Sequence, residues 1–138
     1  MSVVEELIRV EEDNTLSFGN YKLGEKTKLE NFEFEGDLYK VKTYDEITKL
    51  EKNGAFIYES VPGSTVSHFK ADSEGVSFTV EAAEDVQVTL ELEPDNVFRV
   101  FVDGDNMGQM RTNLGGKVNI GVEMSNMDSA QVLIEKAE

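Results

Sequence analysis

The single histidine, His68, is surrounded in the sequence by residue types that support nucleophilic catalysis. Ser64, Ser67 and Asp72 are its near neighbours, and serine, histidine and aspartate are the three members of a hydrolase triad. Residues this close together on one predicted strand do not easily converge on a substrate. We therefore expect a structural histidine and no catalytic residue at this position.

The stretch 103–108 resembles the start of a calcium-binding loop, with aspartate at its first and third positions and glycine at its sixth. The fifth position is Met107, and the twelfth is Leu114 where such loops have a bidentate glutamate. We therefore expect a hairpin turn, with calcium as the alternative, and no other metal or cofactor. The candidate calcium ligands are Asp103, Asp105 and Asn106.

The abundance of acidic residues does not by itself indicate a glycoside hydrolase. Glycoside hydrolysis requires two carboxylates at a suitable separation, and 28 acidic residues produce many accidental pairs. Sialic-acid enzymes hold the substrate carboxylate with three arginines, and this chain has three, Arg9, Arg99 and Arg111. No sequence pattern brings these arginines together, and the Asp-box motif of sialidases is absent from the sequence.

Aromatic residues are concentrated in the first half of the chain, where nine of the 12 phenylalanines and tyrosines precede residue 70. A tyrosine combines a flat apolar ring with a hydroxyl, which suits a sugar-binding surface. The chain has no tryptophan, so packing in the core and at sheet edges is the simpler interpretation. If the chain binds a ligand, we expect the tyrosines to contribute, and they are Tyr21, Tyr39, Tyr44 and Tyr58.

The charge and composition of the chain argue against several classes of protein. With 13 basic and 28 acidic residues among 138, the formal net charge is −15, which repels nucleic acids and anionic membranes. There is no cysteine, so disulfides, thiolate metal sites and cysteine nucleophiles are excluded. The first 13 residues lack the features of a secretion signal, and no apolar run is long enough to span a bilayer. We expect a cytoplasmic location.

Apolar and polar residues alternate in three successive runs, 76–80, 86–92 and 98–102, which predicts strands with one buried face. If consecutive strands pair through the short loops between them, the expected partners are Val80 with Val88, Phe78 with Leu90, Leu92 with Phe98, and Leu90 with Val100. The same reasoning for the last two runs pairs Val122 with Val132 and Ile120 with Ile134.

Tight turns predict hairpins in the first half of the chain. A loop at Gly36-Asp37 would place Phe34 opposite Tyr39, Phe32 opposite Val41 and Glu33 opposite Lys40. Asn53-Gly54 is a strong hairpin signal and is preferred to a short helix in the segment before it. Residues 7–12 and 15–21 fit a further hairpin, although residues 2–8 also fit one face of a helical turn.

About a dozen short strands with regular turns indicate an all-β fold, an antiparallel β-sandwich or flattened barrel. We expect one domain spanning residues 1–138, with an aromatic-rich part over 1–70 and a regular meander over 75–136. Because packing explains the meander, the aromatic-rich part is the better place to look for a functional site.

Several runs resemble a family of small bacterial all-β proteins that often carry the label "endosialidase". These runs are 15–21, 38–43, 47–54, 58–63 and 112–117. They are strand and turn sequences without a catalytic signature, so the resemblance implies little chemistry, and endosialidases proper are large trimeric β-propeller enzymes. The run 98–104, with Gly108 and Gly115-Gly116, separately resembles β-sandwich domains appended to glycoside-active enzymes.

These observations favour a non-catalytic β-sandwich that binds a protein or a carbohydrate. A small carbohydrate-active enzyme, as implied by the family label, is the alternative. The partners expected are a protein or glycan ligand and, through an exposed sheet edge, a further copy of the chain. We expect neither nucleic acid nor membrane as a partner.

Overall fold

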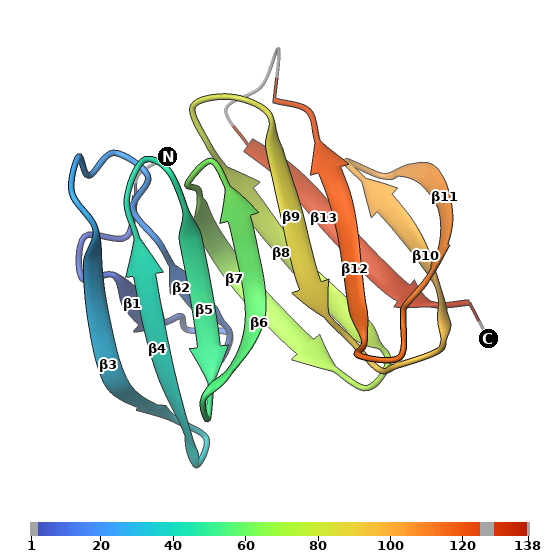
Figure 1. Ribbon diagram of the computed structural model, residues 1–138, viewed down its shortest axis with the longest axis horizontal. Coiled ribbons are helices and arrows are strands. Elements are labelled where there is room, and N and C mark those ends of the chain that lie inside the picture. The colour runs from blue at the N-terminus through green and yellow to red at the C-terminus, as the bar shows by residue number, and fades with distance from the viewer. Residues whose placement is uncertain (1–2, 125–128, 138) are drawn as a thin grey trace.

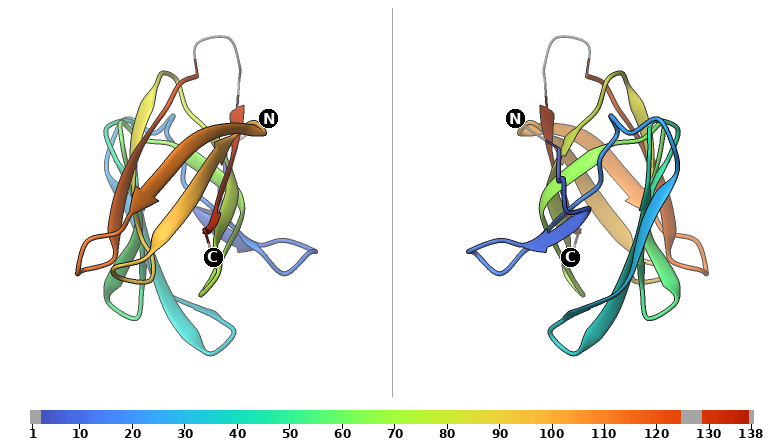
Figure 2. Two further views of the ribbon diagram at one scale, coloured as in Figure 1. Left: turned by 90° about the vertical axis from the view of Figure 1, so that its right-hand side faces the viewer. Right: turned by 90° about the vertical axis from the view of Figure 1, so that its left-hand side faces the viewer.

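The computed structural model describes residues 3–124 and 129–137. The described residues form 13 strands in two antiparallel sheets that face each other, and they contain no helix. Figures 1 and 2 show the sheets as two layers. The expected antiparallel β-sandwich is thereby confirmed.

The seven-stranded sheet, sheet A, contains both ends of the described chain. Its strands lie in the order β1 (Ile8–Val10), β2 (Leu16–Phe18), β7 (Thr65–Asp72), β8 (Gly75–Glu81), β13 (Ser129–Lys136), β10 (Val97–Val102) and β11 (Asp105–Arg111). The six-stranded sheet, sheet B, has the order β12 (Lys117–Val122), β9 (Val86–Glu91), β6 (Ala55–Val61), β5 (Thr48–Lys52), β4 (Asp37–Thr43) and β3 (Thr27–Phe34).

The expected meander in the second half of the chain is wrong. Strands β8, β10 and β13 belong to sheet A, whereas β9 and β12 belong to sheet B, so the chain repeatedly crosses from one sheet to the other. The expected pairs between β8 and β9, β9 and β10, and β12 and β13 are therefore not formed; β8 pairs with β7 and β13, and β9 with β12 and β6. A strand that faces its neighbour across the core has the same alternation as one that hydrogen-bonds to it, so the pattern could not distinguish the two arrangements.

The first hairpins are largely as expected, but one register is wrong. The β3–β4 turn is Glu35-Gly36, with φ of 53° and 85°, so Phe34 pairs with Asp37, Phe32 with Tyr39 and Glu33 with Leu38. Glycine is at the second central position of this turn, where a type I′ turn requires a positive φ. A bulge before Phe32 then shifts the pairing, and Val41 lies opposite Leu29.

Two other hairpins confirm the sequence prediction. Asn53-Gly54 joins β5 to β6, with φ of 52° and 88°. Strand β1 pairs with β2, so residues 7–12 and 15–21 do form a hairpin. Residues 3–7 belong to no helix or strand, and residue 2 lies outside the described residues.

The two sheets meet around Tyr58, which β6 of sheet B inserts among three phenylalanines of sheet A. Its ring makes edge contacts with Phe18, Phe69 and Phe78, with centroids 5.2, 6.1 and 5.6 Å away. These rings interlock in edge-to-face geometry, which adds to the free energy gained by burial alone. Tyr58 is fully buried, so this contact fixes the position of one sheet on the other.

A buried polar network closes one end of the space between the sheets. The Tyr58 hydroxyl lies 2.8 Å from Ser64 Oγ, which also contacts Ser60 Oγ at 2.7 Å. The Thr48 hydroxyl donates to the carbonyl oxygen of Ser64 and lies 2.8 Å from the hydroxyl of Thr43. All five side chains are buried, and their hydrogen bonds offset the cost of removing these polar groups from water.

Gly75, at the start of β8, provides a test of the sheet A register. A Cβ atom there would lie 1.9 Å from the carbonyl oxygen of Ile134 on β13, and its φ of 149° disfavours other residues. We predict that Gly75→Ala lowers the free energy of unfolding by about 3 kcal/mol in urea denaturation. Gly24→Ala, at a site with nothing within 4 Å of the added atom, should change it by less than about 0.5 kcal/mol. Equal effects of the two substitutions would contradict the β8–β13 contact.

Candidate functional site

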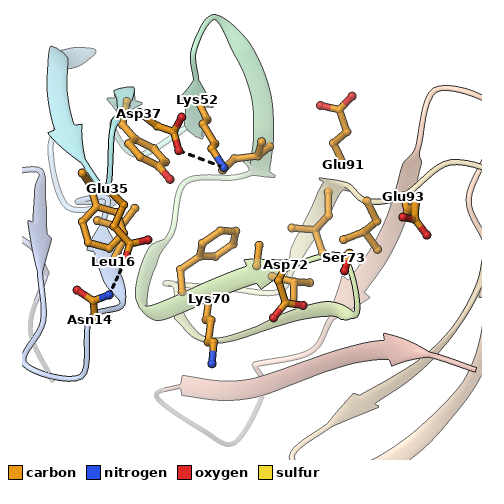
Figure 3. Close-up of a pocket in the computed structure, with 18 residues that line it drawn as sticks. Asn14, Leu16, Glu35, Asp37, Lys52, Lys70, Asp72, Ser73, Glu91 and Glu93 are labelled. Atoms are coloured by element: carbon orange, nitrogen blue, oxygen red, sulfur yellow. Dashed lines mark hydrogen bonds and ion pairs between the residues drawn. The ribbon is translucent and has the colours of Figure 1, made fainter.

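The end of the sandwich opposite the polar network contains a cleft between the two sheets. Its volume is about 580 Å³, and its lining includes residues of the β3–β4, β5–β6 and β7–β8 hairpins. The tips of these hairpins are at the lower end of Figure 1. Figure 3 shows its lining, which consists of Asn14, Leu16, Phe34, Glu35, Asp37, Tyr39, Lys52, Ile57, Phe69, Lys70, Ala71, Asp72, Ser73, Val76, Leu90, Glu91, Leu92 and Glu93.

The floor of the cleft is apolar and is built by both sheets. Leu16, Phe69 and Val76 come from sheet A, while Tyr39 and Leu90 come from sheet B, and all five are buried. Their strands alternate between core-facing and outward positions, and these residues occupy the core-facing ones where the two sheets separate. The half-buried side chains of Phe34, Ile57 and Leu92 extend this surface toward the mouth.

Charged side chains surround the mouth. Figure 3 places them around the edge of the cleft: five carboxylates (Glu35, Asp37, Asp72, Glu91 and Glu93) and two lysines (Lys52 and Lys70). Lys52 Nζ lies 3.5 Å from Asp37 Oδ2, so one of the lysines is already paired. Burial, together with the charges of Asp37 and Glu35, raises the pKa of Tyr39 above its ordinary value. The mouth is therefore a region of negative potential above an apolar floor.

The β1–β2 loop connects the two sheets at the edge of the cleft. Asn14, with φ of 66°, donates a side-chain hydrogen bond to the carboxylate of Glu35 at the tip of the β3–β4 hairpin (Figure 3). The preceding residue, Asp13, accepts hydrogen bonds from the backbone and hydroxyl of Thr15, and these lower its pKa. This local bonding fixes the shape of the loop and, with it, one wall of the cleft.

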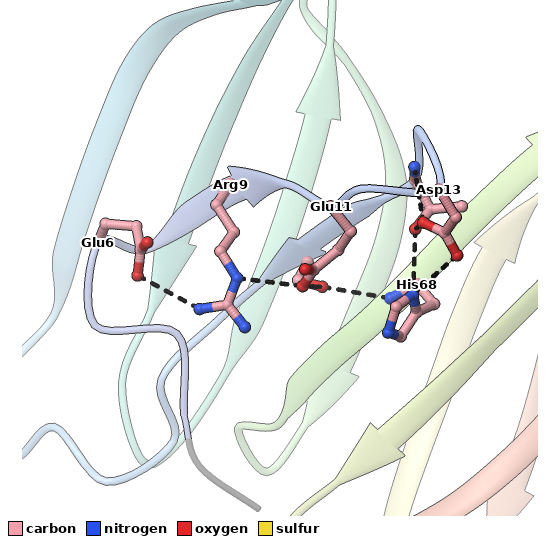
Figure 4. Close-up of polar contacts among 7 residues, drawn as sticks. Glu6, Arg9, Glu11, Asp13 and His68 are labelled. Carbon is pink, nitrogen blue, oxygen red and sulfur yellow. Dashed lines mark hydrogen bonds and ion pairs between the residues drawn. The ribbon is translucent and has the colours of Figure 1, made fainter.

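His68 contacts this same loop and takes no part in a triad. Its Nδ1 lies 3.0 Å from Asp13 Oδ2 and 3.3 Å from the hydroxyl of Thr15 (Figure 4). Ser64 is instead hydrogen-bonded within the core, and Asp72 lies at the mouth of the cleft. His68 occupies a bulge in β7 with φ of 54°, which places its half-exposed side chain beside the β1–β2 loop.

The three arginines do not converge on one site, and each has a partner. Arg9 is on β1, at one edge of sheet A, where it bonds Glu11 at 3.0 Å (Figure 4). A hydrogen bond from Ser17 and the adjacent Arg9 lower the pKa of Glu11. Near the other edge of sheet A, Arg99 and Arg111 lie on the neighbouring strands β10 and β11, where Arg99 donates to the carbonyl oxygen of Ala137 and Arg111 pairs with Asp95 at 3.0 Å. The structure therefore does not bring the three arginines together.

The four tyrosines do not converge either. Tyr39 contributes to the floor of the cleft, whereas Tyr58 is buried in the core, where no ligand can reach it. The hydroxyl of Tyr21 donates to Glu81 at 3.3 Å, and that of Tyr44 donates to Glu46 at 3.1 Å. Of the four tyrosines, Tyr39 alone lines the cleft.

The calcium candidate is the turn between β10 and β11. Asp103 and Gly104 have φ of 52° and 84°, as a type I′ turn requires. Asp103 Oδ1 accepts the backbone N–H of Gln131 at 2.9 Å, and Asn106 Oδ1 accepts that of Gly108 at 2.8 Å. Within residues 3–124 and 129–137, no group of three or more histidine or acidic side chains is arranged to hold a metal ion.

Sequence reasoning did not find the cleft. Leu16, Phe69 and Leu90 lie at core-facing positions like those of residues deeper between the sheets, so no local pattern marks them as the floor of a cleft. The sequence does show that Glu35, Asp37 and other acidic residues lie at turns and strand ends. These positions indicate a charged cleft mouth only once it is known which turns lie at the same end of the sandwich.

Comparison of the chain with protein-family models, curated proteins and solved structures finds no match. The resemblance to proteins labelled "endosialidase" therefore remains an expectation from the sequence. Among the described residues, no helix is both long enough and apolar enough to cross a membrane.

Tyr58 provides a test of the core that supports the cleft. Burial raises its pKa from 10.0 to about 12, so between these values the unfolded chain loses this proton while the folded chain keeps it. Stability should therefore fall with rising pH, by up to about 1.4 kcal/mol per pH unit. Tyr58→Phe should cost about 1 kcal/mol at pH 7 through its lost hydrogen bond.

The measurement is the free energy of unfolding of both proteins between pH 7 and 12. We predict that the advantage of the native chain over Tyr58→Phe shrinks above pH 10, because the variant lacks the ionising hydroxyl. A difference that stays constant over this range would contradict a buried, neutral Tyr58.

Proposed function

We propose that this protein is a non-catalytic binding module that takes an apolar group of a protein partner into the cleft between its sheets. One observation carries the proposal, the preformed cleft of about 580 Å³ with a floor of Leu16, Phe69, Val76 and Leu90. Ligand sites of proteins are typically concave, mostly apolar and of this size, roughly 300–1,000 Å³.

The chemistry of the floor favours a protein side chain over a sugar. A sugar ring needs hydrogen-bonding partners for its hydroxyl groups; polar side chains of this kind line the mouth, but the floor offers only the hydroxyl of Tyr39. A leucine or phenylalanine side chain needs none and gains roughly 1.5–3 kcal/mol when it is fully buried. The cleft therefore supports the protein-binding form of the expected module better than the carbohydrate-binding form.

Filling the cleft should abolish binding of an apolar molecule. Ala71 lines the cleft, is exposed, and pairs with Val76 of the floor, so Ala71→Trp places an indole at the mouth without removing a core side chain. We predict that N-phenyl-1-naphthylamine, a neutral apolar fluorophore, binds the native chain and that Ala71→Trp weakens binding at least about tenfold, equivalent to 1.4 kcal/mol. Fluorescence titration measures both affinities.

The matched control is Ala83→Trp, which adds the same indole at an exposed position in the β8–β9 loop, outside the cleft. This variant should bind the fluorophore within about twofold of the native chain, and urea denaturation should show that both variants are folded. The proposal fails if the native chain does not bind, or if both tryptophans weaken binding equally. Turnover of polysialic acid that Arg99→Ala or Arg111→Ala abolishes would also contradict a non-catalytic role.

A further inference from the structure

We infer that the partner presents its apolar group within a basic peptide segment, in which lysine or arginine residues lie on both sides of a large apolar side chain. This inference rests on the proposed function, because it concerns the partner of the same cleft. It adds a requirement for positive charge that the apolar floor alone would not impose.

The carboxylates at the mouth come from both sheets. Glu35 and Asp37 belong to the β3–β4 hairpin of sheet B, and Glu91 and Glu93 lie at the end of β9 in the same sheet. Asp72 belongs to β7 of sheet A, on the other side of the cleft. A segment that crosses the mouth would therefore meet negative charge on each side of the apolar floor.

Three of these carboxylates, Glu35, Asp72 and Glu91, have no basic partner among the described residues. Glu35 accepts its hydrogen bond from the neutral amide of Asn14, and Asp72 accepts one from the backbone N–H of Glu74. Asp37, by contrast, is paired with Lys52 and Glu93 with Lys136. Glu35, Asp72 and Glu91 are thus available to cations of a partner, and Figure 3 shows Glu35 and Asp72 on different sides of the cleft.

The separation of these charges favours a peptide over a small organic amine. A single ammonium group can contact one side of the mouth, whereas a segment with a cation before and after its apolar residue can contact Glu35 and Asp72 together. Burial is the main cause of the raised pKa of Tyr39, and the charges of Asp37 and Glu35 add to it; those charges disfavour a further negative charge at the floor and favour a positive one.

The overall charge of −15 would attract any cation, so the test must separate the local carboxylates from this general field. Glu35→Gln with Asp72→Asn removes two charges at the mouth and keeps an oxygen that can accept each existing hydrogen bond. The matched control, Glu25→Gln with Glu123→Gln, removes two charges from exposed side chains outside the cleft. Both double variants have the same net charge.

Three capped tetrapeptides serve as ligands: two leucines between lysines, two leucines between glutamates, and two serines between lysines. Phenethylamine represents a small amine. In isothermal titration of the native chain, the lysine–leucine peptide should bind at least about tenfold more tightly than each of the other three ligands. The mouth variant should lose at least about fivefold of this affinity, and the control variant less than about twofold.

Equal binding of the lysine and glutamate peptides, or equal losses in the two double variants, would overturn the inference. Binding of phenethylamine as tight as that of the peptide would assign the cleft to a small amine instead. Binding of the neutral fluorophore distinguishes failure of this inference from failure of the proposed function. If it binds while the peptides show no preference, the cleft is a binding site without the inferred charge selection; if neither binds, the proposed function itself fails.

Discussion

The insertion of Tyr58 between the sheets is the contact on which the rest of the structure depends. Tyr58 comes from sheet B, and its ring packs against the rings of Phe18, Phe69 and Phe78 from sheet A. Its hydroxyl contacts Ser64 in the polar network that closes one end of the core. An edge-to-face ring cluster and a directed hydrogen bond restrict sliding and rotation of one sheet on the other. The two ends of the sandwich can therefore differ, one closed by hydrogen bonds and the other open.

The open end combines two properties that are difficult to obtain together. Apolar side chains such as Leu16 and Leu90 form its floor, and carboxylates at the surrounding turns keep the mouth hydrated and negatively charged. The β1–β2 loop holds one wall through Asn14 and Glu35, and its own shape depends on Asp13. A concave apolar floor with polar groups around its mouth is typical of a place where another molecule binds.

Local patterns in the sequence predicted the strands, most turns and the sandwich, because alternation and turn residues are local properties. Pairing was not predictable in the same way. Val80 and Val88 both face the core, and only the complete structure shows that they belong to opposite sheets. The cleft was missed for a related reason: Leu16, Phe69 and Glu35 are far apart along the chain, and no local pattern shows that three hairpins end beside one another.

The most direct test of the account is a methyl NMR titration of the native chain with the neutral apolar fluorophore. The account predicts that the resonances of Leu16, Val76 and Leu90, in the floor, shift on binding, while those of Val86 and Val122, which are buried outside the cleft at the other end of strands β9 and β12, do not. Shifts confined to the outer faces of the sheets, or no saturable shift at all, would contradict a binding site between the sheets.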